Sequence, residues 1–194
     1  MEPLEPPEWQ VFRITVLTLL ATSIFSGITI AITIFLLVVI LFMAIGMLFG
    51  APWVPSSKGI GRKMLEMGDV KPGEIVYDLG SGDGRLVVLA AREFKAKATG
   101  IEINPFWVFW TRLAVVIFRL GHTVRIIWGN FYDQDLGEAD IVLLYLLQGT
   151  NASIRPKLER ELRPGTRIIS HVYTFDGWKP EKSDEESDIY LYRR

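Results

Sequence analysis

The sequence predicts an α/β fold with a mostly parallel sheet, preceded by an N-terminal transmembrane helical segment. Three observations carry this prediction. Residues 14–49 contain no charged side chain. From residue 73 onward, short apolar runs typical of buried strands alternate with longer helix-like segments, which indicates a parallel sheet covered by helices. The first of these runs ends in the glycine-rich turn "GSGDG", residues 80–84.

The composition narrows the class of function. The chain has 194 residues, which suits one domain and an appended segment. Its 21 basic and 22 acidic residues nearly balance, whereas a nucleic-acid-binding domain is usually strongly basic, so no nucleic-acid partner is expected. The absence of cysteine excludes disulfides and Cys-based metal sites, and the two histidines, His122 and His171, lie far apart in the sequence. No metal site is therefore predicted.

Residues 1–50 are predicted to form a membrane anchor. As a helix, the charge-free run of 36 residues would span about 54 Å, compared with about 30 Å for the hydrocarbon core of a bilayer. The run is also too long for the core of a signal peptide, which has roughly 7–15 residues. Its most apolar part, residues 28–50, is long enough to cross the bilayer alone.

Two arrangements of this anchor fit the sequence. In a hairpin that turns at Ser26 and Gly27, Trp9 and Trp53 would lie at one interface, and Arg13 would share the cytoplasmic side with the basic residues 58, 62 and 63. The alternative is one long helix, because hydroxyl side chains keep helical phase across Gly27, at Thr15, Thr18, Thr22, Ser26, Thr29 and Thr33. We favour the hairpin. Both arrangements place the C-terminal domain in the cytosol.

Residues 51–72 are predicted to be a linker followed by a capping helix. Pro52 and Pro55 would end the membrane helix, and Ser56 or Ser57 would cap the next one. Residues 58–67 have the apolar spacing of a short amphipathic helix.

Residues 73–194 are predicted to form the ligand-binding domain. Six segments have the pattern of strands, namely residues 74–80, 97–103, 124–130, 139–147, 166–173 and 188–194. Helices are expected at residues 85–94, 105–120 and 154–162, the second with Pro105 in its first turn, where a missing N–H costs nothing. The charged run 181–188 is expected to be a solvated loop.

Polar residues follow the first three of these strands. The turn 80–84 ends the first strand, Glu102 lies at the end of the second, and Asn130 lies at the end of the third. Ligands of such sheets bind beyond the carboxyl ends of the strands. These residues are therefore predicted to converge on one crevice.

The turn itself discriminates between ligands. It lacks the Gly-Lys-Ser/Thr of a P-loop and the GxGxxG spacing of a dinucleotide site, because its third glycine comes one residue early. An acid within it, Asp83, disfavours phosphate. A ligand with sulfonium and ammonium groups fits better, and Asp78 could face such a group. We therefore predict S-adenosylmethionine, with Glu102 accepting the ribose hydroxyls, Asn130 offering its amide to the adenine edge and Phe131 stacking beside it.

Several segments resemble the membrane-anchored class I (seven-β-strand) lysine methyltransferases, namely "VPSSKGIGRKML", "VYDLGSGDGRLVVLAA", "GIEINPFWV" and "RPKLERELRPGTRIISH". The resemblance covers residues 51–194 and implies a Rossmann-like class I methyltransferase that depends on S-adenosylmethionine. It implies that Asp78, Gly80 and Gly82 hold the methionine end of the cofactor. It further implies that Glu102 holds the ribose and Asn130 the adenine side. The predicted cofactor-binding residues are Asp78, Gly80, Ser81, Gly82, Asp83, Gly84, Glu102, Ile103, Asn130 and Phe131.

The sequence departs from the expected pattern in three places. Superfamily members usually carry an acid where this chain has Asn130. The family's fourth strand leads into "YLLP", whereas residues 145–148 of this chain read "YLLQ". Only fourteen residues separate Tyr173 from Asp188, which is too few for the last helix of the full fold. A trimmed sheet of about six strands is therefore expected.

The resemblance predicts a protein-lysine N-methyltransferase that acts on a membrane-associated protein at the cytosolic face, since eukaryotic members modify the proteolipid ring protein of ATP synthase and the adenine nucleotide translocase. The lipid bilayer is an expected partner. The anchor would equally serve a methyltransferase for a lipid or quinone-like membrane molecule, and a non-catalytic cofactor-binding membrane adaptor is a third alternative. Tyr145 is expected to orient the acceptor amine, and His171 to be a half-buried histidine with its hydrogen bonds satisfied.

Overall fold

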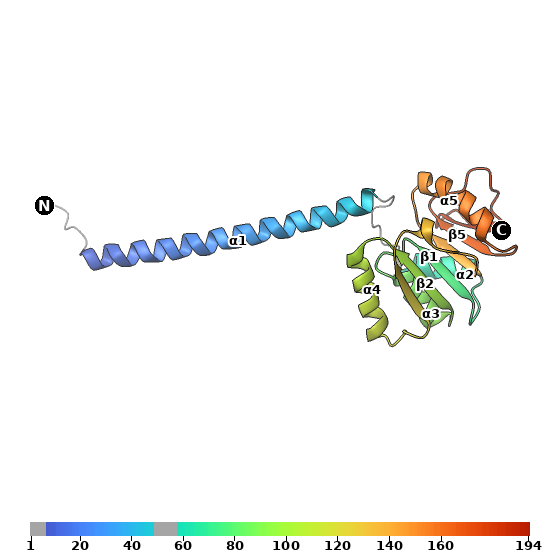
Figure 1. Cartoon of the computed structure of the whole chain (residues 1–194), viewed down its shortest axis with the longest axis horizontal. Helices are drawn as coiled ribbons and strands as arrows, with labels where there is room; N and C mark the ends of the chain where they lie inside the picture. The colour runs from blue at the N-terminus through green and yellow to red at the C-terminus, as the bar shows by residue number, and fades with distance from the viewer. Residues whose placement is uncertain (1–6, 49–57) are drawn as a thin grey trace. The chain divides into compact units, whose positions relative to one another are not determined.

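The computed structural model describes residues 7–48 and 58–194 (Figure 1). The chain divides into two compact units, residues 1–42 and 43–194. Several residues of the predictions lie outside the described residues. They are Trp53, expected to share one interface with Trp9, and the residues expected to end the membrane helix and to cap the next one, Pro52, Pro55, Ser56 and Ser57.

The N-terminal part of the chain is one continuous helix, α1 (Glu8–Leu48), of 41 residues. It runs through Gly27 without a break, so the hairpin favoured from the sequence is wrong. A glycine in a helix interior costs only about 1 kcal/mol, whereas a turn would leave backbone N–H and C=O groups without partners. The threonine hydroxyls donate to carbonyls one turn earlier, as Thr18 does to Ile14 (2.8 Å). By length and composition, Glu8–Leu41 could cross a membrane.

The C-terminal unit is built on a seven-stranded sheet in the order β3-β2-β1-β4-β5-β7-β6. Five strands run parallel, and β7 lies antiparallel between β5 and β6. The strands are β1 (Ile75–Leu79), β2 (Lys97–Glu102), β3 (Val124–Trp128), β4 (Ile141–Leu144), β5 (Arg167–His171), β6 (Lys182–Asp184) and β7 (Ile189–Arg193). Because the strand order reverses between β1 and β4, the ligand crevice of such a sheet lies there, beyond the carboxyl ends of the strands.

The expected count of about six strands is wrong by one, because β6 forms within the charged run that we expected to be a loop. Lys182–Asp184 pairs antiparallel with residues 189–191 of β7. Two ion pairs hold this edge, between Glu181 and Arg193 (2.7 Å) and between Asp184 and Lys63 (3.6 Å). As the short spacing predicted, no helix lies in residues 172–181.

Helices cover both faces of the sheet unequally. On one face lie α2 (Lys58–Met67), α3 (Arg85–Glu93) and α4 (Pro105–Ile117), whose apolar side chains pack with Val76 and Leu143 in the first core cluster. On the other face α5 (Gln148–Glu161) buries Ile154 and Leu158 against Val142 in the second core cluster. Right-handed crossovers produce this division, since α3 and α4 connect strands on one side of β1 and α5 connects strands on the other.

Candidate active site

The glycine turn closes the carboxyl end of β1 in a conformation that requires glycine. Gly80, Gly82 and Gly84 have φ angles of 77°, 51° and 74°, a region that residues with a Cβ rarely occupy. The backbone N–H groups of Gly80 and Ser81 donate to the Ile101 carbonyl at 2.9 and 3.0 Å. The turn is therefore tied to the neighbouring strand β2.

Glu102, at the end of β2, contacts the turn directly. Its carboxylate accepts the Gly82 N–H at 2.8 Å and the Asn104 N–H at 2.7 Å. Burial raises the pKa of Glu102 above its ordinary value, and these N–H donors oppose that rise. The predicted convergence of the glycine turn and Glu102 is confirmed.

Asp78, at the end of β1, is buried, with only 3% of the residue exposed. Burial, together with the nearby acids Glu102 and Asp83, raises the pKa of Asp78 to about 8. Within the part of the chain that the structure describes, no hydrogen-bond donor or cation pairs with its carboxylate. A buried, unpaired acid at a strand end suits a positively charged ligand group.

The register of the sheet extends this row of polar groups across two further strands. Leu79 of β1 is level with Ile101 of β2 and with Leu144 of β4, and Leu144 is level with Ser170 of β5. The residues that follow these four positions in the chain are Gly80, Glu102, Tyr145 and His171. These positions bring Glu102, Tyr145 and His171 to the same edge of the sheet as Asp78 and the glycine turn.

Tyr145 and His171 form an aromatic pair at this edge, with ring centroids 4.3 Å apart. Burial raises the pKa of the Tyr145 hydroxyl and lowers the pKa of His171, so both side chains are uncharged at neutral pH. His171 is buried rather than half-buried, and its Nδ1 has no hydrogen-bond partner in the described part of the chain. The expectation that all hydrogen bonds of His171 are satisfied is wrong for Nδ1, because the ring packs on Tyr145 and no polar group among the described residues pairs with this atom.

Comparison with known proteins places the chain in a family. The family model for the ANTKMT methyltransferase domain matches residues 78–182. The chain belongs to this family. A protein-lysine N-methyltransferase of Saccharolobus islandicus is 42% identical over 151 residues, which are 73% of this chain and 92% of that protein. An adenine nucleotide translocase lysine N-methyltransferase of Mus musculus is 30% identical over 66% of this chain, and the match spans 56% of the length of that relative.

A solved structure shows the same fold and a bound product of methyl transfer. The RNA methyltransferase from Salinibacter ruber, in complex with S-adenosyl-L-homocysteine, has a TM-score of 0.70 and 39% sequence identity over 72% of this chain and 93% of that one. The fold is the Rossmann-like fold of class I methyltransferases, and the cofactor is S-adenosylmethionine. In the present chain, the unpaired Asp78 and the buried Glu102 fit a ligand that carries an ammonium group and ribose hydroxyls.

Two residues of the turn have roles that the sequence did not reveal. Asp83 pairs with Arg85, whose Nε lies 3.0 Å from Oδ1. Because that ion pair balances its charge, Asp83 disfavours phosphate less than the sequence alone indicated. A Cβ at Gly84 would overlap the buried side chain of Thr111 on α4, and the Thr111 hydroxyl donates to the Gly82 carbonyl at 3.1 Å. Gly84 thus permits close packing of α4 on the turn.

The end of β3 brings Asn130 next to the site. The Gly129 N–H donates to the Glu102 carbonyl at 3.0 Å, and Asn130 Oδ1 accepts the Tyr132 N–H at 3.0 Å, which caps the short 3₁₀ helix Phe131–Asp133. Phe131 is 9% exposed and belongs to the second core cluster. Its ring therefore packs mainly against protein. The carbonyl of half-buried Ile103 accepts the Trp128 indole N–H at 3.1 Å.

A polar cluster between α5 and the end of β5 was not predicted. Asn151 of α5 is fully buried, and its amide nitrogen donates to Ser170 Oγ and to the Tyr173 carbonyl, both at 3.1 Å. Val172, between His171 and Tyr173, has a φ of 68°, which is rare for a β-branched residue. Strain of this kind persists where surrounding contacts enforce it, and it gathers at functional sites.

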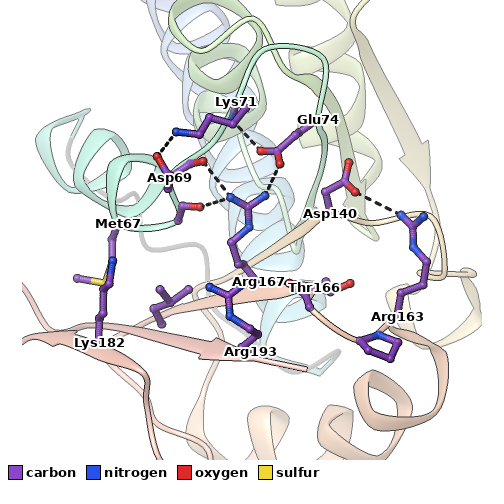
Figure 2. Close-up of a pocket in the computed structure, with 14 residues that line it drawn as sticks. Met67, Asp69, Lys71, Glu74, Asp140, Arg163, Thr166, Arg167, Lys182 and Arg193 are labelled. Atoms are coloured by element: carbon purple, nitrogen blue, oxygen red, sulfur yellow. Dashed lines mark hydrogen bonds and ion pairs between the residues drawn. The ribbon is translucent and has the colours of Figure 1, made fainter.

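A separate cavity of about 530 Å³ lies at the opposite, amino-terminal end of the strands (Figure 2). Arg167 donates to the Gly68 and Asp69 carbonyls at 2.7 and 2.9 Å and pairs with Glu74. Three further ion pairs join cavity residues to acids, Lys71–Asp69, Arg163–Asp140 and Arg193–Glu181. Acids and bases thus pair with one another in this cavity, whereas Asp78 at the carboxyl end of the strands has no cationic partner in the described part of the chain.

Proposed function

We propose that this methyltransferase transfers a methyl group from S-adenosylmethionine to the ε-amine of a lysine in a protein. The observation that carries the proposal is the row of polar groups across four neighbouring strands. Acids on β1 and β2 suit the charged and ribose parts of the cofactor, and the uncharged pair Tyr145–His171 adjoins them on β4 and β5. The relative from Saccharolobus islandicus, which matches over nearly its whole length, is named for this activity.

Individual roles follow from chemistry. The Asp78 carboxylate would pair with the ammonium of the cofactor, the Glu102 carboxylate would accept its ribose hydroxyls, and the Asn130 amide nitrogen would face its adenine edge. Gly80, Ser81 and Gly82 would line the methionine end. When bound, the cofactor supplies an electrophilic sulfonium methyl, and the protein mainly has to align the acceptor with it.

The acceptor must reach the site as a neutral amine. Removing the proton from a lysine with a pKa near 10.4 costs about 4–5 kcal/mol at neutral pH. The uncharged pair Tyr145–His171, here called the aromatic wall, favours the neutral form of the amine, because desolvation penalises the ammonium. Tyr145 would orient the amine with its hydroxyl, and His171 would fix the Tyr145 ring by packing on it.

The substrate would lie in or at a membrane, on the cytosolic face. The helix α1 supports this through its length and apolar composition. Anchoring raises the effective concentration of a partner held in the same bilayer. Relatives named for lysine methylation of an ATP synthase component and of the adenine nucleotide translocase support a protein acceptor.

The experiment that tests the proposal uses the full chain, native membranes and methyl-labelled S-adenosylmethionine. Label in a protein band, located on lysine by mass spectrometry, is the expected result. Label confined to the organic extract would instead identify a lipid or quinone-like acceptor. Label in RNA would match the name of the Salinibacter ruber relative, although the net charge of −1 gives no support for a polyanionic substrate. No transfer to any fraction, with intact cofactor binding, would leave only the adaptor function.

A further inference from the structure

The outer face of α4 is apolar, in contrast to that of every other helix of the described domain. Its large exposed apolar side chains recur at helical spacing, at Phe106, Phe109, Trp110, Leu113, Val116 and Ile117. Phe109, Val116 and Ile117 are 67%, 72% and 65% exposed. The inner face of α4 buries Val108 and Val115 in the first core cluster, together with Thr111.

Comparison with the neighbouring helices shows how unusual this face is. The exposed residues of α2 include Arg62, Lys63 and Glu66, and those of α5 include Ser153 and Arg160. Apart from Trp128, Tyr132 and Leu147, all exposed large hydrophobic side chains of the described domain lie in residues 106–118. Contiguous apolar surface of this kind marks an interaction site.

The charge around α4 indicates what covers it. Residues 103–132 contain no acidic side chain, but they contain Arg112, Arg119 and Arg125. Aromatic side chains from this stretch, including Phe109 and Trp110, are exposed. Aromatic and basic residues together are typical of helices that lie in the interface of an anionic membrane.

The covalent connection to α1 brings a membrane within reach. Only residues 49–57 join the end of α1 to the start of α2, and nine residues span at most about 30 Å. The apolar stretch Glu8–Leu41 is long enough to enter a bilayer. A domain tethered so closely to a membrane-inserted helix stays near the membrane surface.

We propose that the outer face of α4 docks in the lipid interface of the membrane that α1 enters. This inference rests on the membrane part of the proposed function but not on the identity of the acceptor. Docking through α4 would restrict the rotation of the domain about its tether. Since Thr111 of α4 contacts the glycine turn, the docked helix would also fix the orientation of the cofactor site relative to the bilayer.

The chain contains no cysteine, so single labels can test the docking cleanly. Phe109→Cys on α4, Phe25→Cys on α1 and Ser153→Cys on α5 each receive an environment-sensitive fluorophore. The full chain is then inserted into vesicles of phosphatidylcholine and phosphatidylglycerol with spin-labelled lipid as the quencher. We expect quenching at positions 109 and 25 but not at position 153, which is exposed on the other side of the sheet.

The possible outcomes separate the docking from the anchoring. Quenching at position 25 without quenching at position 109 would overturn the docking and leave α1 as an anchor. No quenching at either position would overturn both. A label at position 109 that is shielded from water without lipid quenching would indicate a protein occupant, such as a second copy of this chain, and would also overturn the proposal. As a second measurement, Phe109→Glu should lower the lipid quenching of a label placed at Val116→Cys about tenfold, whereas Ser153→Glu should not.

Discussion

Charged side chains lie at both the amino-terminal and the carboxyl-terminal ends of the strands, but they are paired differently at the two ends. At the amino-terminal end, Arg167 pairs with Glu74 and Arg163 pairs with Asp140 (Figure 2). At the carboxyl end, Asp78 and Glu102 are buried close together without a cation in the described part of the chain. One end pairs opposite charges within the fold, whereas the other leaves Asp78 and Glu102 without a cationic partner in the described part of the chain, as the proposed cofactor site requires. The difference predicts which substitutions affect binding and which affect stability.

The largest effect on binding is expected at Glu102. Glu102→Ala removes the proposed acceptor of the ribose hydroxyls and leaves the Gly82 and Asn104 N–H groups without their partner. We expect S-adenosylmethionine binding, measured by isothermal calorimetry, to weaken about 100-fold. Glu66→Ala, an exposed acid on α2, is the matched control and should bind normally. Unchanged binding by a folded Glu102→Ala protein would refute the assignment of this end of the sheet.

The converse substitution at the other end should affect stability and leave binding intact. The Arg167 side chain is 13% exposed and joins Glu74 to the loop carbonyls of Gly68 and Asp69. Arg167→Met leaves these groups unpaired, so the free energy of unfolding should fall by about 2 kcal/mol, measured by chemical denaturation. Cofactor affinity at a temperature where the variant is folded should equal that of the parent. A loss of affinity would show that the two ends are coupled.

The Asp78 carboxylate should lower the stability of the cofactor-free protein and strengthen cofactor binding. Its pKa in the folded protein is about 8, compared with an ordinary value of 3.8. Between these values the unfolded chain has lost the proton that the folded, cofactor-free protein keeps, so the stability contributed by Asp78 declines as pH rises. Asp78→Asn should therefore unfold at a higher temperature than the parent near pH 7.5, and the advantage should vanish below pH 4. Calorimetric scans of both proteins across this range measure it.

The same substitution should weaken cofactor binding about tenfold, because a charge-assisted hydrogen bond to the ammonium is lost. In the parent, affinity should rise with pH between about 6 and 7.5, below the range in which an α-amino group loses its proton. Asp78→Asn should lack that rise. Equal pH profiles for the two proteins would mean that Asp78 does not meet the cation.

Local patterns predicted the central strands and the glycine turn better than they predicted the edges of the fold. The apolar runs and the glycine spacing lie within a few residues, so the strands, the turn and its contact with Glu102 followed from the sequence. The strand β6 did not, because its polar residues gain order only by pairing with β7. The hairpin was favoured because it would place the tryptophans at one interface and the basic residues on one side of the membrane. These features do not determine whether the helix continues through Gly27. Contacts such as Thr111 with Gly82 join residues far apart in the sequence, and no local signal marks them.

The smallest expected effect concerns the acceptor side of the carboxyl end. Tyr145→Phe keeps the packing on His171 and removes only the hydroxyl. If that hydroxyl orients the amine, the turnover number on the membrane substrate should fall roughly threefold to tenfold, the value of one neutral hydrogen bond. The affinity for S-adenosylmethionine should not change. Tyr190→Phe, which is half-buried against the second core cluster, is the matched control. Unchanged turnover for Tyr145→Phe would leave Tyr145 as part of the aromatic wall, with orientation of the amine supplied by backbone carbonyls.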